Sequence, residues 1–333
     1  MNSYERFYAR LNGQTVDKIP NLNIAMTLVA KCAGVSYREY AQDYRKLVEG
    51  NLICAERFGF DAVSAISDPM REASAFGAEV HFPENGVPYS KPYLLEDTAD
   101  LSRIKITDPL ESPRTLDRIK AVELLRKRVG RDYPVIGWVE GVLAELGDLR
   151  GVNNLMLDLV EEEDWLGELM EIVFSQQKRF ALEQIKAGAD VIGVGNAVAS
   201  LIGPSLYEDF ALKYDKDLVE FIHQNGARVK LHICGNIEPL LPLLTQVAPD
   251  ILDIDWMVDF KKAVDTFSGL PTCVSGNIDP VAVLLQGSGA DIERKTRECI
   301  ETADSTTFIA AGCEVPADTP EENLLLMDRL LYL

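Results

Sequence analysis

The stretch Val229-Lys230-Leu231-His232-Ile233-Cys234-Gly235-Asn236 has the pattern of a buried strand that ends beside a functional site. Its first part is apolar and β-branched, and a glycine then breaks the run. Alternate residues of a strand point to the same side, so His232 and Cys234 should project together. An imidazole and a thiolate are both good zinc ligands. The pair alone is weak support for a metal, because free cysteine is among the most frequently buried residue types.

A third candidate ligand, Cys313, comes after a second apolar run, Phe308-Ile309-Ala310-Ala311, and just before an expected loop. Three such ligands at strand ends, with no fourth cysteine nearby, are typical of a catalytic zinc site with one open position. The other cysteines show no Cys-x-x-Cys spacing and are expected to be buried apolar residues of a protein in a reducing, cytoplasmic location.

Apolar runs of strand length recur along the whole chain and alternate with segments of helical periodicity. This alternation predicts an α/β fold with eight parallel strands, a (β/α)8 TIM barrel, in a single domain over residues 1–333. A doubly wound open sheet is the alternative. Residues 71–109 show no clear period and predict an irregular insertion after the second strand, with a small hairpin. The expected strands are residues 19–26, 61–68, 134–140, 190–195, 227–232, 250–255, 271–275 and 306–311.

The active site of such a barrel lies at the C-terminal ends of its strands. Three acids end expected strands, namely Asp68, Glu140 and Asp255, and they are therefore candidate catalytic residues. They could orient a ligand through its second ring nitrogen, and Glu140 could also fill the fourth zinc position when substrate is absent. The alternative is that these carboxylates cap loops.

Composition restricts the partners. The 333 residues carry 53 acidic and 33 basic side chains, a formal charge of −20. Binding to nucleic acid and to anionic membranes rests on basic patches, so neither partner is expected. The N-terminus has no apolar signal region, and no stretch approaches the roughly 18 apolar residues of a membrane span.

Several motifs resemble the uroporphyrinogen decarboxylase superfamily over nearly the whole chain. They are Ser67-Asp68-Pro69, Phe76-Gly77, Gly276-Asn277-Ile278-Asp279-Pro280 and Thr319-Pro320-Glu321-Glu322-Asn323. The decarboxylases of this superfamily hold the carboxylates of their substrate with arginines in the loop after the first strand. They also use a tyrosine in the loop after the third strand. Here residues 21–26 contain no arginine, and no tyrosine stands between Tyr133 and Tyr207. Of the decarboxylase catalytic set, only Asp68 is matched.

The other branch of the superfamily, the zinc-dependent methylcobamide:coenzyme M (thiol) methyltransferases, has a zinc motif of His-x-Cys and a distant Cys. His232, Cys234 and Cys313 match this motif residue by residue. The resemblance implies a Zn²⁺ cofactor and methyl transfer between a corrinoid protein and a thiol such as coenzyme M or a related acceptor. A thiol that binds zinc loses its proton and becomes a nucleophile.

Two alternative functions remain open: a porphyrinogen decarboxylase with a diverged site, and a non-catalytic barrel that binds a corrinoid protein. Corrinoid-binding domains of the relevant kind carry an Asp-x-His-x-x-Gly motif, which none of the three histidines of this chain fits. We therefore expect the corrinoid to arrive on a separate partner protein, with residues 71–109 forming part of the docking rim.

Overall fold

Seven parallel strands form one curled sheet in the computed structural model, which describes residues 1–97, 99–161 and 164–333. Each strand pairs with the next along the chain, so the spatial order is β1 to β7. This is a TIM-barrel-like α/β fold. The strands are β1 Val63–Ser64, β2 Val135–Glu140, β3 Val191–Gly195, β4 Arg228–Ile233, β5 Ile251–Ile254, β6 Cys273–Ile278 and β7 Phe308–Ala311.

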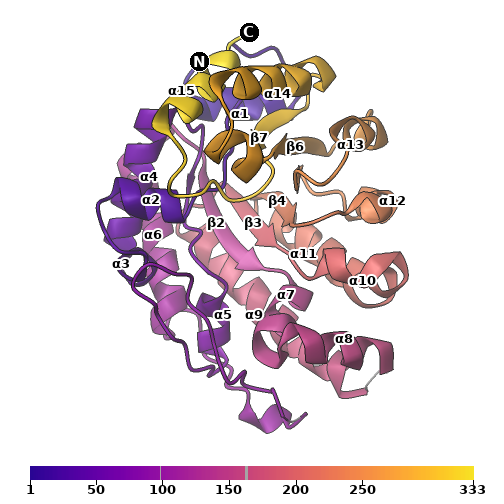
Figure 1. Ribbon diagram of the computed structural model, residues 1–333. Helices are drawn as coiled ribbons and strands as arrows, with labels where there is room; N and C mark the ends of the chain where they lie inside the picture. The colour runs from indigo at the N-terminus through magenta and orange to yellow at the C-terminus, as the bar shows by residue number, and fades with distance from the viewer. Residues whose placement is uncertain (98, 162–163) are drawn as a thin grey trace.

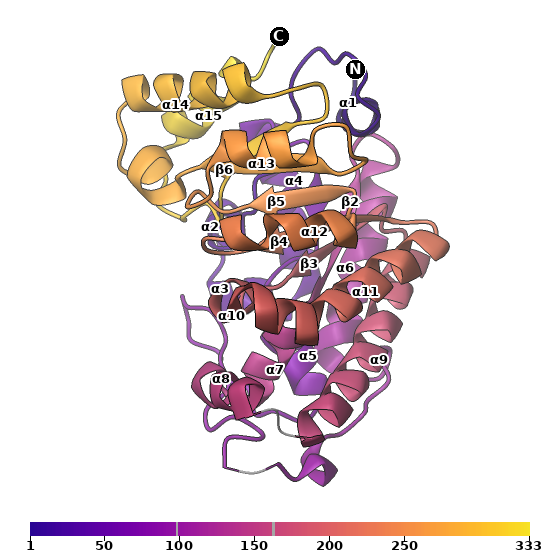
Figure 2. The same ribbon diagram turned by 90° about the vertical axis from the view of Figure 1, so that its right-hand side faces the viewer.

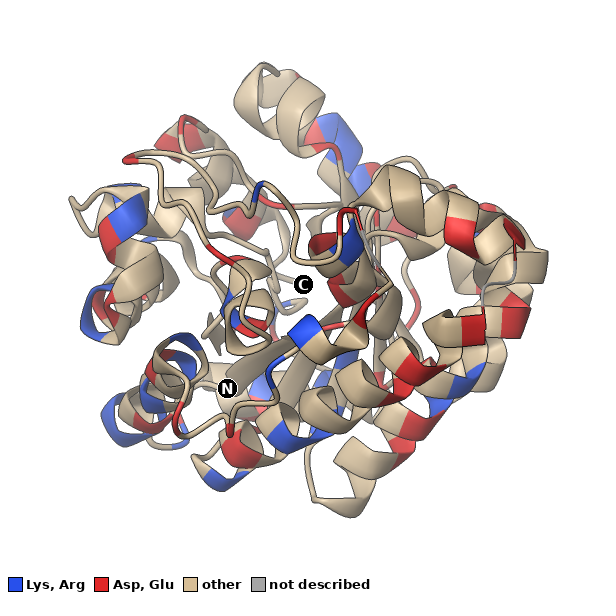
Figure 3. Cartoon of the chain, turned by 90° about the horizontal axis from the view of Figure 1, so that it is seen from below, with Lys and Arg blue, Asp and Glu red and all other residues tan. Residues whose placement is uncertain are grey.

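Helices cover the outer face of the sheet, and both termini lie at the same end of the molecule (Figures 1 and 2). Lysine and arginine are interspersed with aspartate and glutamate around these helices (Figure 3). No helix in the described part of the chain is long and apolar enough to cross a membrane. The helices are α1 Ser3–Leu11, α2 Thr27–Cys32, α3 Tyr37–Gln42, α4 Tyr44–Phe58, α5 Met70–Ala75, α6 Pro113–Val129, α7 Val142–Arg150, α8 Val152–Glu161, α9 Asp164–Lys186, α10 Ala199–Leu206, α11 Leu212–Gln224, α12 Leu241–Val247, α13 Phe260–Phe267, α14 Gly289–Thr302 and α15 Glu321–Leu330.

Strands β2, β3 and β5 are buried along nearly their whole length, as expected where helices cover one face and the curled interior is filled. The larger apolar cluster lies between sheet and helices, and a smaller one includes Ile136, Val191 and Ile251 together with Phe7 of α1. Burial of these side chains stabilises the fold by about 1.5–3 kcal/mol for each large apolar side chain.

The expected first strand at residues 19–26 is absent as a regular strand, which corrects the eight-stranded prediction for the described residues. The segment still lies between β1 and β7, but isolated contacts replace a ladder. Asp61 N–H donates to Asn21 O at 2.8 Å, and Ala311 N–H donates to the side-chain Oδ1 of Asn23 at 2.7 Å. Pro20 removes one donor, and the two asparagines bond through side chain as well as backbone, so no continuous ladder forms.

Residues 71–109 also differ from the expectation at their start, because helix α5 takes up Met70–Ala75. Beyond it, the described residues up to α6 form one 3-10 turn, Leu101–Arg103, and one antiparallel bridge between His81 and Tyr89. The bridge corresponds to the expected small hairpin.

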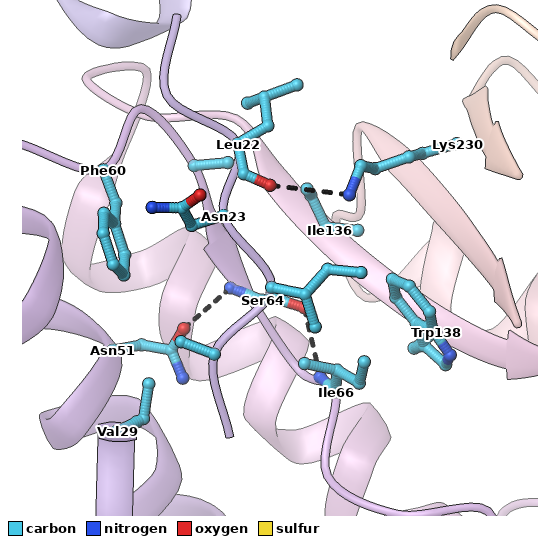
Figure 4. A pocket seen from close by; sticks show the side chains of 13 residues that line it. Leu22, Asn23, Val29, Asn51, Phe60, Ser64, Ile66, Ile136, Trp138 and Lys230 are labelled. Carbon is cyan, nitrogen blue, oxygen red and sulfur yellow. Dashed lines mark hydrogen bonds between the residues drawn. The ribbon is translucent and has the colours of Figure 1, made fainter. Parts of the chain in front are cut away.

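A small cavity of about 30 Å³ lies inside the curled sheet (Figure 4). Lys230 of β4 reaches into it and donates to Leu22 O at 3.5 Å, which ties the 19–26 segment to the sheet. Trp138 and Ile66 line both this cavity and a larger one at the C-terminal ends of the strands.

Candidate metal centre

Three side chains that are far apart in the sequence meet at the C-terminal ends of the strands. His232 Nε2 lies 3.1 Å from Cys234 Sγ and 4.0 Å from Cys313 Sγ, and the two sulfur atoms are 3.7 Å apart. Within the described residues, this is the group of His, Cys, Asp or Glu side chains close enough to hold a metal ion. The structure thus brings together the three residues that the sequence singled out.

These separations fit tetrahedral coordination. Zinc bonds of about 2.3 Å to sulfur and about 2.0–2.1 Å to nitrogen place two sulfurs roughly 3.8 Å apart and a nitrogen and a sulfur roughly 3.6 Å apart. The sulfur–sulfur distance of 3.7 Å agrees, and the two nitrogen–sulfur distances of 3.1 and 4.0 Å bracket the second value. The donor set of two thiols and one imidazole suits zinc.

Two glycines give the ligands their positions. Gly235 directly follows Cys234 and has φ +86°, a conformation that side-chain-bearing residues rarely adopt, so the chain turns away from β4 at once. At Gly312, a Cβ would lie 2.2 Å from the backbone nitrogen of Trp256. The chain before Cys313 therefore packs directly against the backbone that follows β5, and Gly312 N–H donates to Ile278 O at 2.8 Å.

A buried carboxylate orients the histidine. Asp253 lies opposite His232 in the register of β4 and β5, and its Oδ2 is 2.9 Å from His232 Nδ1. The same oxygen accepts from Lys230 Nζ at 2.9 Å. With Nδ1 facing the carboxylate, Nε2 is left to face the two sulfurs. This is the carboxylate–histidine arrangement usual at metal sites.

Electrostatic interactions favour the charged forms of His232 and Cys313. Burial opposes the charged form of His232, but hydrogen bonds with Asp253 and Cys313 outweigh it and raise the pKa of the imidazole to about 9. The hydrogen bond from Cys234 and the nearby His232 outweigh burial and lower the pKa of Cys313 to about 4, while the pKa of Cys234 is raised. The site thus favours a thiolate, which is the form of cysteine that binds metal.

The three predicted acids have different surroundings. Asp68 and Glu140 line the same cavity as the three candidate ligands. Asp68 forms an ion pair with Arg114, and Glu140 Oε1 accepts from Arg71 at 2.7 Å. Asp255 does not line this cavity. Its two oxygens accept from the backbone N–H groups of Gly235 at 2.9 Å and Met257 at 3.0 Å, so it fixes the loop that follows the ligands.

Sequence reasoning missed three groups. Asp253 was not singled out, although a carboxylate inside an apolar strand is a signal that an imidazole or a cation faces it. Arg71 and Glu314 also line the cavity, each beside a residue that the sequence did indicate, Asp68 and Cys313. The positions of all three groups depend on tertiary structure.

The cavity has a volume of about 240 Å³. Apolar side chains, among them Met26, Ile66 and Trp138, form much of its wall, which also includes the three candidate ligands. Such a space admits a small organic molecule beside the two sulfurs.

Comparisons with family models and with known protein sequences agree on the family to which the chain is similar. The family model described as uroporphyrinogen decarboxylase (URO-D) matches residues 2–330. The methylcobamide:CoM methyltransferase MtbA of Methanosarcina mazei is 28% identical over 329 residues, which cover 97% of this chain and 95% of that protein. The uroporphyrinogen decarboxylase of Trichodesmium erythraeum is 30% identical over 304 residues, covering 87% and 82%.

Among solved structures, a methyltransferase from Methanosarcina mazei superimposes with a TM-score of 0.85 at 23% identity and covers 99% of this chain and 98% of its own. A B12-independent methionine synthase from Shewanella sp. W3-18-1 has a TM-score of 0.60 at 12% identity, with 93% and 95% covered. At these identities the likeness concerns the fold.

Proposed function

From the premise that the chain belongs to the uroporphyrinogen decarboxylase family, we propose that it is a zinc-dependent methyltransferase. It moves a methyl group between a separate corrinoid (methylcobamide) protein and a thiol such as coenzyme M or a related acceptor. The observation that carries the proposal is the trio of His232, Cys234 and Cys313, whose donor atoms all lie within 4.8 Å of one another beside a cavity. The names of the methyltransferase relatives support it.

In this proposal His232, Cys234 and Cys313 hold zinc. When bound, zinc supplies a Lewis-acid centre at which a thiol loses its proton at neutral pH. Asp253 keeps the imidazole oriented through Nδ1, and Asp255 keeps the loop at Gly235 in place. In the transfer, the sulfur–carbon bond forms as the carbon–cobalt bond breaks, the electron pair stays on cobalt, and the thiol proton goes to solvent.

Glu140 and Asp68 are proposed to act on the substrate side of the cavity. Burial raises the pKa of Glu140, whereas the adjacent Arg71 favours its ionised form. Glu140 is engaged with Arg71, and within the described residues it does not belong to the group that could hold a metal. Its predicted role as fourth ligand therefore requires that the carboxylate turn away from Arg71.

The proposal takes residues 1–333 as one barrel domain in which segment 19–26 has the place of the first strand and the irregular residues that follow α5 form an insertion. A reducing compartment such as the cytoplasm suits a site that needs two reduced cysteines. The corrinoid is expected on a partner, which has to present its methyl group within about 3–3.5 Å of the attacking sulfur. The insertion, which contributes Val87 to the cavity wall, is proposed to belong to the docking rim.

A decarboxylase with a diverged site is the second candidate function, favoured by the 30% identity to a uroporphyrinogen decarboxylase. Its substrate carries several carboxylates, which need cationic bidentate partners. Among the described residues that line the cavity, Arg71 is the one arginine or lysine, and its side chain is fully buried against carboxylates. The site therefore supports this function less well.

Metal analysis combined with a methyl-transfer assay tests the proposal. Purified protein should contain one zinc and should demethylate methylcobalamin when a thiol is added. Cys234→Ala and Cys313→Ala should each lose zinc and activity, whereas Cys299→Ala, at a buried cysteine of α14 outside the site, should keep both. Equal zinc in all four proteins would refute the ligand assignment, and zinc without thiol-dependent demethylation would favour the non-catalytic barrel.

A further inference from the structure

Among the described residues of the cavity wall, the charged side chains outside the candidate metal centre that retain some exposure are the carboxylates of Glu140 and Glu314. The Glu140 side chain is 13% exposed, and Glu314, beside Cys313, is half-buried. Arg71 lines the same cavity, but the exposed fraction of its side chain is 0%. A molecule in the cavity can therefore contact the carboxylates of Glu140 and Glu314, whereas the guanidinium of Arg71 is buried behind other side chains.

Arg71 already lies against carboxylates of the protein. Its Nη2 donates to Glu140 Oε1 at 2.7 Å, its Nε lies 2.9 Å from Glu72 Oε2, and its Nη1 donates to the carbonyl oxygen of Asp68. An anionic group that sought this guanidinium would have to displace a buried carboxylate, leaving that carboxylate without its cation. The guanidinium is thus unsuited to bind a sulfonate, phosphate or carboxylate.

The side chain of Glu314 is held by hydrogen bonds from Thr27 to one of its carboxylate oxygens. Its Oε1 accepts from Thr27 N–H at 2.7 Å and from Thr27 Oγ1 at 2.8 Å. These two donors hold the carboxylate in place beside Cys313 at the cavity wall.

We propose that the methyl acceptor of this chain is a thiol with a cationic or hydrogen-bond-donating group rather than an anionic one, and that Glu140 and Glu314 determine this preference. The inference rests on the proposed function and narrows its acceptor. Coenzyme M, which the names of the relatives give, carries a sulfonate, so this chain should use it poorly. Opposite charges attract and like charges repel most strongly in a partly buried site, where water screens them little.

Three thiols of the form HS–CH2–CH2–X test the inference, because they differ only in X: ammonium in 2-aminoethanethiol, hydroxyl in 2-mercaptoethanol and sulfonate in coenzyme M. The kcat/KM for methylcobalamin demethylation should fall in that order. The kcat/KM for the ammonium thiol should exceed that for the sulfonate thiol at least about tenfold. Glu314→Gln keeps an acceptor for Thr27 but removes the charge, and should lower this ratio several-fold, as should Glu140→Gln.

Asp318→Asn is the matched control, because Asp318 follows in the same loop with a side chain that is 86% exposed and paired with Lys31. It should leave the ratio unchanged. The three S-methylated products, measured as ligands by calorimetry, remove any contribution of thiol acidity and need no turnover. Tightest binding of the sulfonate, or an unchanged ratio in both glutamine variants, would overturn the inference. Loss of turnover with every thiol would count against the proposed function alone, since the calorimetric order still tests the charge preference.

Discussion

A single methyl group at Gly312 should disable the candidate metal centre. In Gly312→Ala the new Cβ would lie 2.2 Å from Trp256 N, 2.8 Å from Trp256 Cα and 2.9 Å from the carbonyl carbon of Asp255. These are backbone atoms, which cannot rotate aside as a flexible side chain can. Ordinary van der Waals contact begins at 3.4 Å, so the chain beside Cys313 has to move by about 1 Å, whereas metal–ligand distances tolerate about 0.2 Å.

We therefore expect Gly312→Ala to weaken zinc binding at least about tenfold, the lower end of what disturbed ligand orientation costs. Overpacking should also lower the free energy of unfolding by about 1–3 kcal/mol. Competition with a chromophoric chelator measures the first effect. Thermal unfolding of the metal-free protein measures the second without any contribution from zinc.

Gly167→Ala is the matched control, because Gly167 lies in α9 and a Cβ there meets nothing within 4 Å. It should keep zinc and gain about 0.5–1 kcal/mol of stability, since alanine is preferred in helices. A folded Gly312→Ala protein with the zinc affinity of the wild type would show that the ligand position does not depend on this close approach, and would refute the reasoning.

Four further predictions concern the site and its surroundings. Asp253→Asn should lower zinc affinity about 10–100-fold in the same chelator assay, since it weakens the acceptor that orients His232; unchanged affinity would contradict this role. Burial raises the pKa of Asp215 from 3.8 to about 6, so the folded state holds its proton more tightly than the unfolded state. The free energy of unfolding should therefore fall as pH rises from about 4 to about 6, and urea titrations should show a smaller fall in Asp215→Asn. Incubation with uroporphyrinogen III should yield no coproporphyrinogen by chromatography, because no uncommitted arginine or lysine is found among the described residues of the cavity wall. The absorption spectrum of the purified chain should show no corrinoid, and a tightly bound one would refute delivery by a partner.

The sequence by itself determined the order of the seven parallel strands and the meeting of the three candidate ligands. Both follow from local patterns. Strand residues two apart share a side, and parallel strands that alternate with helices bring their C-terminal ends to one face. His232, Cys234 and Cys313 each stand at or just beyond a strand end, so the topology alone brings them together. The formal charge of −20 likewise follows from the amino-acid composition and does not depend on the fold.

Tertiary structure alone decided which acids reach those ligands. Asp253 and Asp255 are two residues apart and look equivalent in the sequence, but the register of β4 and β5 sets Asp253 opposite His232. Asp255 lies past the end of β5, where free backbone N–H groups take up both of its oxygens. Pairing across strands depends on registers that the whole sheet fixes. The same holds for segment 19–26, where the Asn23 side chain accepts from the backbone of β7 in place of a strand ladder. It also holds for Arg71, whose charge is covered by the carboxylates of Glu72 and Glu140.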